Sequence, residues 1–172
     1  IAVSWVSGTL NLTDSASESY TALTQRVDAS GGGWRTQLFY FINPTTSSSM
    51  TFSVTATSGV GYPTIDVQAW AKSSGTPAFD VESGLNGTGG SHSTWQIPSA
   101  TPSGNHEIGV SSMILGTTSP TPTGVDSGYT LSDSRTNVGM AYVIQTTAAA
   151  ASPIWSWSAA DTVAAGAQAF FK

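Results

Sequence analysis

The feature that most constrains this chain is an alternation of apolar and polar residues with a period of two, broken by clusters of Gly, Pro, Ser, Thr and Asn. Successive side chains of a β-strand point to opposite faces, so this period predicts strands that are buried on one face. The clearest predicted strands are residues 34–42 and 50–56, which end at Asn43-Pro44 and Ser58-Gly59. Further strands are predicted at 1–6, 64–70, 94–97, 106–115, 129–131, 139–145, 154–158 and 162–171.

The spacing of these segments indicates the fold class. Short strands separated by turn clusters every 8–12 residues or so are typical of antiparallel sandwiches. The only Ala-rich run with a helical character, 148–151, is followed at once by Ser152-Pro153, which favours a turn. We therefore predict an all-β fold, an antiparallel two-sheet β-sandwich of jelly-roll or Ig-like type. Residues 83–93 and 116–128 are predicted to be loops, so residues 1–172 are expected to form a single β-sandwich domain.

The composition excludes several classes of function. Charged residues make up 9% of the chain, with 5 Lys+Arg against 10 Asp+Glu and a net charge of −5. So few basic side chains cannot neutralise a phosphate backbone, which argues against nucleic acid as a partner. The 27 Ser and 24 Thr residues supply polarity in place of charge. The apolar stretches are too short to span a membrane, and the absence of Cys excludes disulfides and a Cys nucleophile.

The strand pattern begins at the first residue, with no turn or cap ahead of it. A strand at a sheet edge presents a row of unpaired N–H and C=O groups. We therefore expect residues 1–6 to pair with a segment upstream of Ile1 or with another subunit. In this interpretation the domain lacks an N-terminal segment.

Few residues form a recognisable chemical constellation. No Gly-x-Ser-x-Gly pentapeptide occurs, and the two histidines, His92 and His106, are too far apart in the sequence to indicate a zinc site. Asp80 and Glu82 share one strand face and are candidate Ca²⁺ ligands together with loop carbonyls. A solvated loop edge is the favoured alternative for that pair. We expect no catalytic activity and no cofactor.

Three aromatic residues are flanked by turn residues. Trp34 follows three glycines, Tyr62 precedes Pro63, and Trp95 follows a Ser/Thr-rich stretch. Aromatic side chains on turns of a rigid scaffold suit stacking on sugar rings or anchoring in a partner interface. The alternative is that each closes an open end of the sandwich. The remaining large residues are predicted to fill the core: Trp5, Leu38, Tyr40, Ile42, Phe52, Val54, Ile65, Val67, Tyr142, Ile144, Trp155, Trp157 and Phe170.

A succession of motifs runs through the chain and is densest in its second half. It comprises the segments 14–20 and 37–43, Phe79-Asp80-Val81, Ser127-Gly128-Tyr129-Thr130-Leu131, Val138-Gly139-Met140-Ala141-Tyr142, Trp155-Ser156-Trp157 and the Ala-rich end 164–172. This succession resembles a β-sandwich surface module, jelly-roll or Ig-like, found in bacteriophage virion proteins and bacterial secreted proteins. The resemblance implies a non-catalytic protein on an extracellular or virion surface, and it implies no particular ligand.

Two functional hypotheses follow. The first is a non-catalytic structural surface protein, a capsid decoration or tail component of a phage virion or part of another extracellular assembly, which mediates attachment. Its partners would be other virion or surface subunits, and it would be oligomeric or bound to the assembly. The second is a secreted carbohydrate-binding module that holds glycans with Trp34, Tyr62 and Trp95. The absent catalytic constellation and the family resemblance favour the first.

Overall fold

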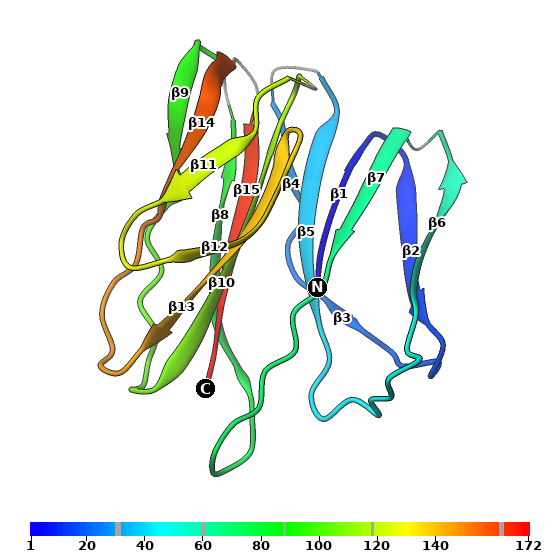
Figure 1. Ribbon diagram of the computed structural model, residues 1–172, viewed down its shortest axis with the longest axis vertical. Helices are drawn as coiled ribbons and strands as arrows, with labels where there is room; N and C mark the ends of the chain where they lie inside the picture. Colours follow the sequence, from blue (N-terminus) through cyan, green and yellow to red (C-terminus); the bar gives the residue numbers. More distant parts are fainter. Residues whose placement is uncertain (30–31, 60, 88, 118, 162–163) are drawn as a thin grey trace.

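The computed structural model describes residues 1–29, 32–59, 61–87, 89–117, 119–161 and 164–172, and every regular element within them is a β-strand (Figure 1). All strand pairs are antiparallel. The prediction of an all-β antiparallel fold is therefore confirmed. No helix in the described part of the chain is long and apolar enough to cross a membrane.

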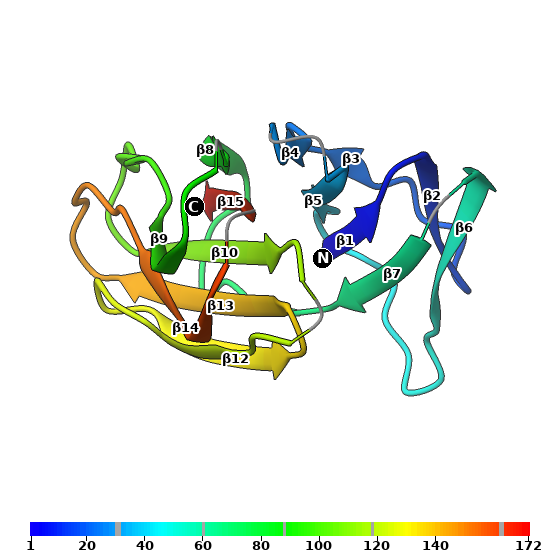
Figure 2. The same ribbon diagram turned by 90° about the horizontal axis from the view of Figure 1, so that it is seen from above.

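The first seven strands form the N-terminal part. They are β1 (Ala2–Val6), β2 (Thr9–Asp14), β3 (Thr21–Ala22), β4 (Arg26–Val27), β5 (Trp34–Tyr40), β6 (Phe52–Ser58) and β7 (Gly61–Asp66). One sheet has the order β3-β5-β1-β7, with β4 also pairing with β5, and β2 and β6 form a separate two-stranded sheet. Viewed from above, β1, β2, β6 and β7 lie on the side of the molecule away from β9, β13 and β14 (Figure 2).

The other eight strands form a two-sheet sandwich. They are β8 (Phe79–Asn86), β9 (His92–Gln96), β10 (Glu107–Leu115), β11 (Pro122–Val125), β12 (Thr130–Arg135), β13 (Val138–Gln145), β14 (Ile154–Asp161) and β15 (Ala164–Phe171). A five-stranded sheet with the order β12-β13-β10-β15-β8 faces a three-stranded sheet with the order β11-β14-β9. The main hydrophobic cluster lies between them and includes Trp155, Trp157 and Phe170, as predicted from the sequence.

The five-stranded sheet is covered on both faces. A second cluster joins Ala2 and Leu38 of the N-terminal sheet to Val110, Met140 and Ala169 of the five-stranded sheet. The sequence reflects this double burial, because β15 begins Ala-Ala-Gly-Ala and all but its last residue are buried. Small side chains let the layers approach closely. The N-terminal sheet thus adds a third layer to the sandwich.

Strand β1 corrects the expectation that residues 1–6 need a partner from outside the chain. β5 pairs along one side of β1 and β7 along the other, so its backbone groups are satisfied within the described residues. The predicted loops at 83–93 and 116–128 are also wrong in part. β8 extends to Asn86, β9 begins at His92, and Pro122–Val125 forms β11.

Candidate functional site: an aromatic groove with a polar end

A groove of about 1320 Å³ runs between the N-terminal sheet and the outer face of the five-stranded sheet. Three parts of the chain line it: the end of β5 with the residues after it, the segment 67–77 that follows β7, and residues of β10, β13 and β15. We call this the central groove. Its volume exceeds the roughly 300–1,000 Å³ of ordinary small-molecule pockets, so it has room for a segment of a polymer.

Aromatic side chains form a contiguous group at the groove. Tyr40 stacks on Phe79 with ring centroids 5.7 Å apart and meets the edge of Phe171 at 5.3 Å. Phe79 and Phe171 are in edge contact at 5.9 Å. These residues come from β5, β8 and β15, so the rings join the N-terminal sheet to the five-stranded sheet. Of the three, Tyr40 and Phe171 line the groove and give it a rigid apolar surface.

The groove also exposes large apolar side chains to solvent. Trp70 is 45% exposed, Val67 42% and Ile144 60%. The ring of Trp70 lies 4.6 Å from that of Tyr142 at an interplanar angle of 55°. The predicted burial of Val67 and Ile144 is therefore wrong. β13 does alternate, but its outward face at Ile144 is left open to solvent.

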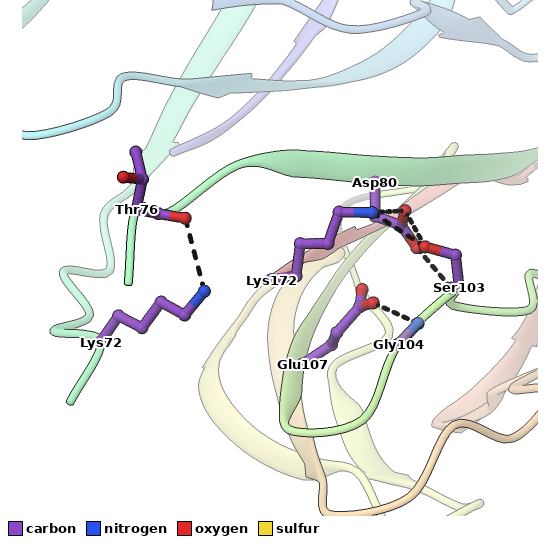
Figure 3. A network of polar contacts seen from close by, with 7 residues as sticks. All are labelled: Lys72, Thr76, Asp80, Ser103, Gly104, Glu107 and Lys172. Carbon is purple, nitrogen blue, oxygen red and sulfur yellow. Dashed lines mark hydrogen bonds and ion pairs between the residues drawn. The ribbon is translucent and has the colours of Figure 1, made fainter. Parts of the chain in front are cut away.

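One end of the groove is polar. Lys172 Nζ donates to Asp80 Oδ1 at 2.7 Å and to Ser103 Oγ at 2.8 Å, while Ser103 Oγ and N donate to the two oxygens of Asp80 (Figure 3). Below this group, Glu107 Oε1 accepts a hydrogen bond from Gly104 N at 2.8 Å. Lys72, on the segment after β7, donates to the carbonyl oxygen of Thr76 at 3.4 Å. The charges at this end are thus largely engaged by neighbours.

The pKa values of the two carboxyl groups at this end, Asp80 and Glu107, are shifted in opposite directions. The hydrogen bonds from Lys172 and then Ser103 hold the pKa of Asp80 well below its usual range. Burial raises the pKa of Glu107, and the hydrogen bond from Gly104 opposes that shift. Glu107 Oε2 is buried without a hydrogen-bond partner. Asp80 is therefore a fixed anion paired with Lys172, whereas the environment of Glu107 disfavours its charge.

Asp80 and Glu82, the candidate Ca²⁺ ligands, both lie on strand β8, and donors from the protein already hydrogen-bond both carboxylates. Glu82 accepts hydrogen bonds from Thr24 N and Thr24 Oγ1, while Asp80 binds Ser103 and Lys172. Within the described residues no group of three or more His, Asp or Glu side chains is arranged to hold a metal ion.

Trp34 and Tyr62 lie at the same end of the N-terminal sheet. Val6 of β1 pairs with Trp34 on one side and with Gly61, the neighbour of Tyr62, on the other. Trp34 is half-buried and packs against Ile114 and two neighbours of the five-stranded sheet. Tyr62 is 75% exposed and has a positive φ of 51°. Tyr62 therefore presents a free ring, although neither residue lines the central groove.

Trp95 corrects the prediction of a third turn-borne aromatic. It lies in strand β9 opposite Trp155, and only 8% of its surface is exposed. The ring of His92 covers it at a centroid distance of 4.8 Å. The predicted strand 94–97 does contain Trp95, but the polar residues His92 and Ser93 before it belong to the same strand as exposed positions and do not form a turn. Trp95 is consequently a core residue and is not available to a partner.

The sequence reasoning missed the central groove. The alternating pattern predicts one strand over 64–70 that ends at Trp70, the groove's exposed aromatic, whereas β7 ends at Asp66 and Trp70 lies on the segment after it. One signal is present in the sequence, because a turn-rich stretch, Lys72-Ser73-Ser74-Gly75-Thr76-Pro77, begins two residues after Trp70. Trp70 is therefore an aromatic residue next to a turn, as Trp34 and Tyr62 are.

Comparison of this chain with family models, with curated proteins and with solved structures finds no match in any of the three. Function is therefore argued from the groove itself.

Proposed function

We propose that this protein is a non-catalytic structural component of an extracellular assembly, such as the surface of a phage virion, and that it associates with a neighbouring copy of itself through the central groove. The observation that carries the proposal is the exposed apolar wall formed by Val67, Trp70 and Ile144. Contiguous exposed apolar surface of this kind marks interaction sites.

The chemistry of the groove favours a polypeptide occupant over a charged ligand. Its aromatic group presents no charge, and the ammonium of Lys172 is already paired with Asp80. An occupant would therefore gain free energy mainly by burying apolar surface. A copy of the same chain is the partner of choice because most soluble oligomers are assembled from identical subunits.

Sedimentation equilibrium tests this proposal with two variants that each add one negative charge. Ile144→Asp places the charge on the groove wall, and Thr123→Asp places it on the exposed face of β11 as a matched control. We expect wild type and Thr123→Asp to associate, and Ile144→Asp to lose roughly thirtyfold in affinity, the effect of a hot-spot contact worth about 2 kcal/mol.

Salt provides a second arm of the same experiment. At about 1 M salt the Debye length falls to about 3 Å, which removes long-range electrostatic attraction. We expect association to persist there, and Trp70→Ala to weaken it more than Lys72→Ala does. A protein that stays monomeric at all accessible concentrations, or an Ile144→Asp variant that associates like wild type, would refute the proposal.

A carbohydrate-binding module is the second candidate, and one observation favours it. Tyr62 and Trp70 both present exposed rings, and Ser73 and Ser74 supply hydroxyl groups beside Trp70. A glycan array separates the two candidates. Binding to a glycan that is lost in Tyr62→Ala or Trp70→Ala, in a protein that remains monomeric, would establish the second candidate and exclude the first.

A further inference from the structure

Three contacts cross from the end of β7 and the segment after it to strands β12 and β13. Asp66 meets Asp133 and Arg135, the side-chain amide of Gln68 donates to Ser132 Oγ, and Trp70 lies against Tyr142. Asp66, Gln68 and Trp70 are alternate residues of one short segment, so the three contacts follow one another along it. Together they hold one wall of the central groove against the five-stranded sheet.

The first of these contacts brings two carboxyl groups together around a single guanidinium. Arg135 Nε lies 2.8 Å from Asp133 Oδ2 but 3.6 Å from Asp66 Oδ1, so it hydrogen-bonds only Asp133. Asp66 is 6% exposed, and its Oδ1 atom receives no hydrogen bond from any described donor. Both carboxyl groups thus lie beside the same guanidinium nitrogen, at 3.6 Å and 2.8 Å, and both line one cavity of about 350 Å³.

Two carboxyl groups that share one guanidinium and one cavity repel each other when both are ionised, and either can donate to the other only when it carries a proton. Buried carboxyl pairs resolve the conflict by sharing one proton, because two like charges in contact cannot both be stabilised. The unpartnered oxygen of Asp66 and its distance from Arg135 identify Asp66 as the protonated member. Asp133, held by Arg135, is the ionised member.

We propose that Asp66 and Asp133 share one proton and act as a pH-dependent latch, which holds the segment 67–71 against β12 in acid and releases it when the pair loses that proton. The latch lies beside the groove: a cavity of about 350 Å³ at the carboxyl pair and the central groove share Val67, Gln68 and Met140 in their linings. Release therefore moves the groove wall that carries Trp70.

The direction of titration agrees with this geometry. Burial, and then the contact with Asp133, raise the pKa of Asp66 to about 7, whereas the contact with Asp66 and the guanidinium of Arg135 lower the pKa of Asp133. The other charged group that faces Asp66 is the amino group of Ile1, beside β1, which acts in the opposite sense to burial. The latch is thus expected to open as the pH rises through neutrality.

Hydrogen exchange tests the latch on the protein alone, with no partner present. Wild type is compared at each pH with Asp66→Asn, which keeps a donor toward Asp133 but cannot ionise, so the intrinsic pH dependence of exchange cancels. Opening is favoured about tenfold more per pH unit between the pKa of a free Asp, about 3.9, and the pKa of about 7 in the closed latch, and it no longer changes above that. From pH 5 to pH 8.5 we therefore expect the protection of residues 67–71 in wild type to fall about a hundredfold relative to Asp66→Asn.

Two further measurements complete the design. Glu18→Gln removes a carboxyl group that faces neither latch residue, and it should exchange like wild type at both pH values. If Asp66→Asn does not fold, carboxyl-carbon NMR of wild type decides, because one of the two aspartates should titrate near neutrality. Equal protection of wild type and Asp66→Asn at pH 8.5, or titration of both aspartates below about pH 5, would overturn the latch.

The inference about the latch is independent of the partner, whereas its effect on association depends on the proposed function. A latch that opens in a protein that never associates would leave the proposed function refuted and the latch intact. Association that is unaffected by pH, in a protein whose latch opens, would show that the groove wall does not contact the neighbouring copy.

Discussion

Gln168 is a fully buried amide in the Ala-rich strand β15, and its removal should destabilise the fold strongly. The two N–H groups of its Nε2 are shared among three acceptors, Ser83 Oγ at 2.8 Å, Pro98 O at 2.7 Å and Ala151 O at 3.0 Å. Its Oε1 accepts from Tyr129 Oη at 2.9 Å. These bonds connect β15 to four separate parts of the sandwich. Gln168→Leu keeps the approximate size of the side chain and removes all of them.

The magnitude follows from what the substitution leaves behind. Ala151 O still accepts from Ala100 N, and Pro98 O still accepts from Ser83 Oγ, so both carbonyls keep a partner. Tyr129 Oη loses its acceptor in a buried site, which costs about 1–3 kcal/mol. With about 1 kcal/mol for the other lost bonds, we expect Gln168→Leu to lower the free energy of unfolding by about 2–4 kcal/mol.

Urea unfolding followed by tryptophan fluorescence measures this loss, and a double-mutant cycle assigns it to the network. Tyr129→Phe alone leaves Gln168 Oε1 unpartnered and should cost about 1–2 kcal/mol. The double variant removes both partners, so it should cost less than the sum of the single variants by at least about 1 kcal/mol. A Gln168→Leu variant within about 0.5 kcal/mol of wild type, or strictly additive effects, would refute this reasoning.

Two other predictions concern packing and pH. A methyl group at Gly139 would lie 2.6 Å from Cζ3 of the buried Trp155, so Gly139→Ala should lower the free energy of unfolding by about 1–3 kcal/mol in the same urea assay. Gly124→Ala is the control: its methyl group would meet no atom within 4 Å, and its free energy of unfolding should stay within about 0.5 kcal/mol of wild type. The hydrogen bonds from Lys172 and Ser103 lower the pKa of Asp80, so ionised Asp80 stabilises the fold above about pH 4, and this stabilisation is lost as the pH falls. Asp80→Asn should therefore be less stable than wild type at pH 7 and should approach the stability of wild type in acid. Equal stability of the two proteins at pH 7 would contradict this prediction.

The sequence predicted the long strands because their patterns run over seven to nine residues. In β5 the buried positions Thr36 and Leu38 alternate with less buried ones, whereas β10 and β13 are mostly buried on both faces and stand out as runs of apolar and small residues. The last four residues of β8, 83–86, fall in the predicted loop because Gly84 and Gly87 favour a loop there. A methyl group at Gly84 would lie 2.1 Å from Nε of Arg26, a residue 58 positions earlier, so that glycine serves a contact between distant parts of the chain. A local pattern does not reveal such a contact.

The groove was beyond sequence reasoning for a related reason. Alternation assigns Met140, Tyr142 and Ile144 to one face of β13, but it does not say how far the N-terminal sheet covers that face. Met140 is 1% exposed and Ile144 60%, although only four residues separate them. The carboxyl pair was equally invisible, because Asp66 and Asp133 are far apart in the sequence and meet only through the packing of β7 against β12.

Alkylation of single engineered cysteines tests the central claim, association through the groove, most directly. The chain has no native Cys, so each label reports on one place. We predict that Ile144→Cys reacts at least about tenfold more slowly at a concentration where the protein associates than at high dilution, as burial in an interface requires. Thr123→Cys, on the exposed face of β11, should react at the same rate under both conditions. Equal rates for Ile144→Cys at both concentrations, in a protein that sediments as an oligomer, would place the interface elsewhere and contradict the account.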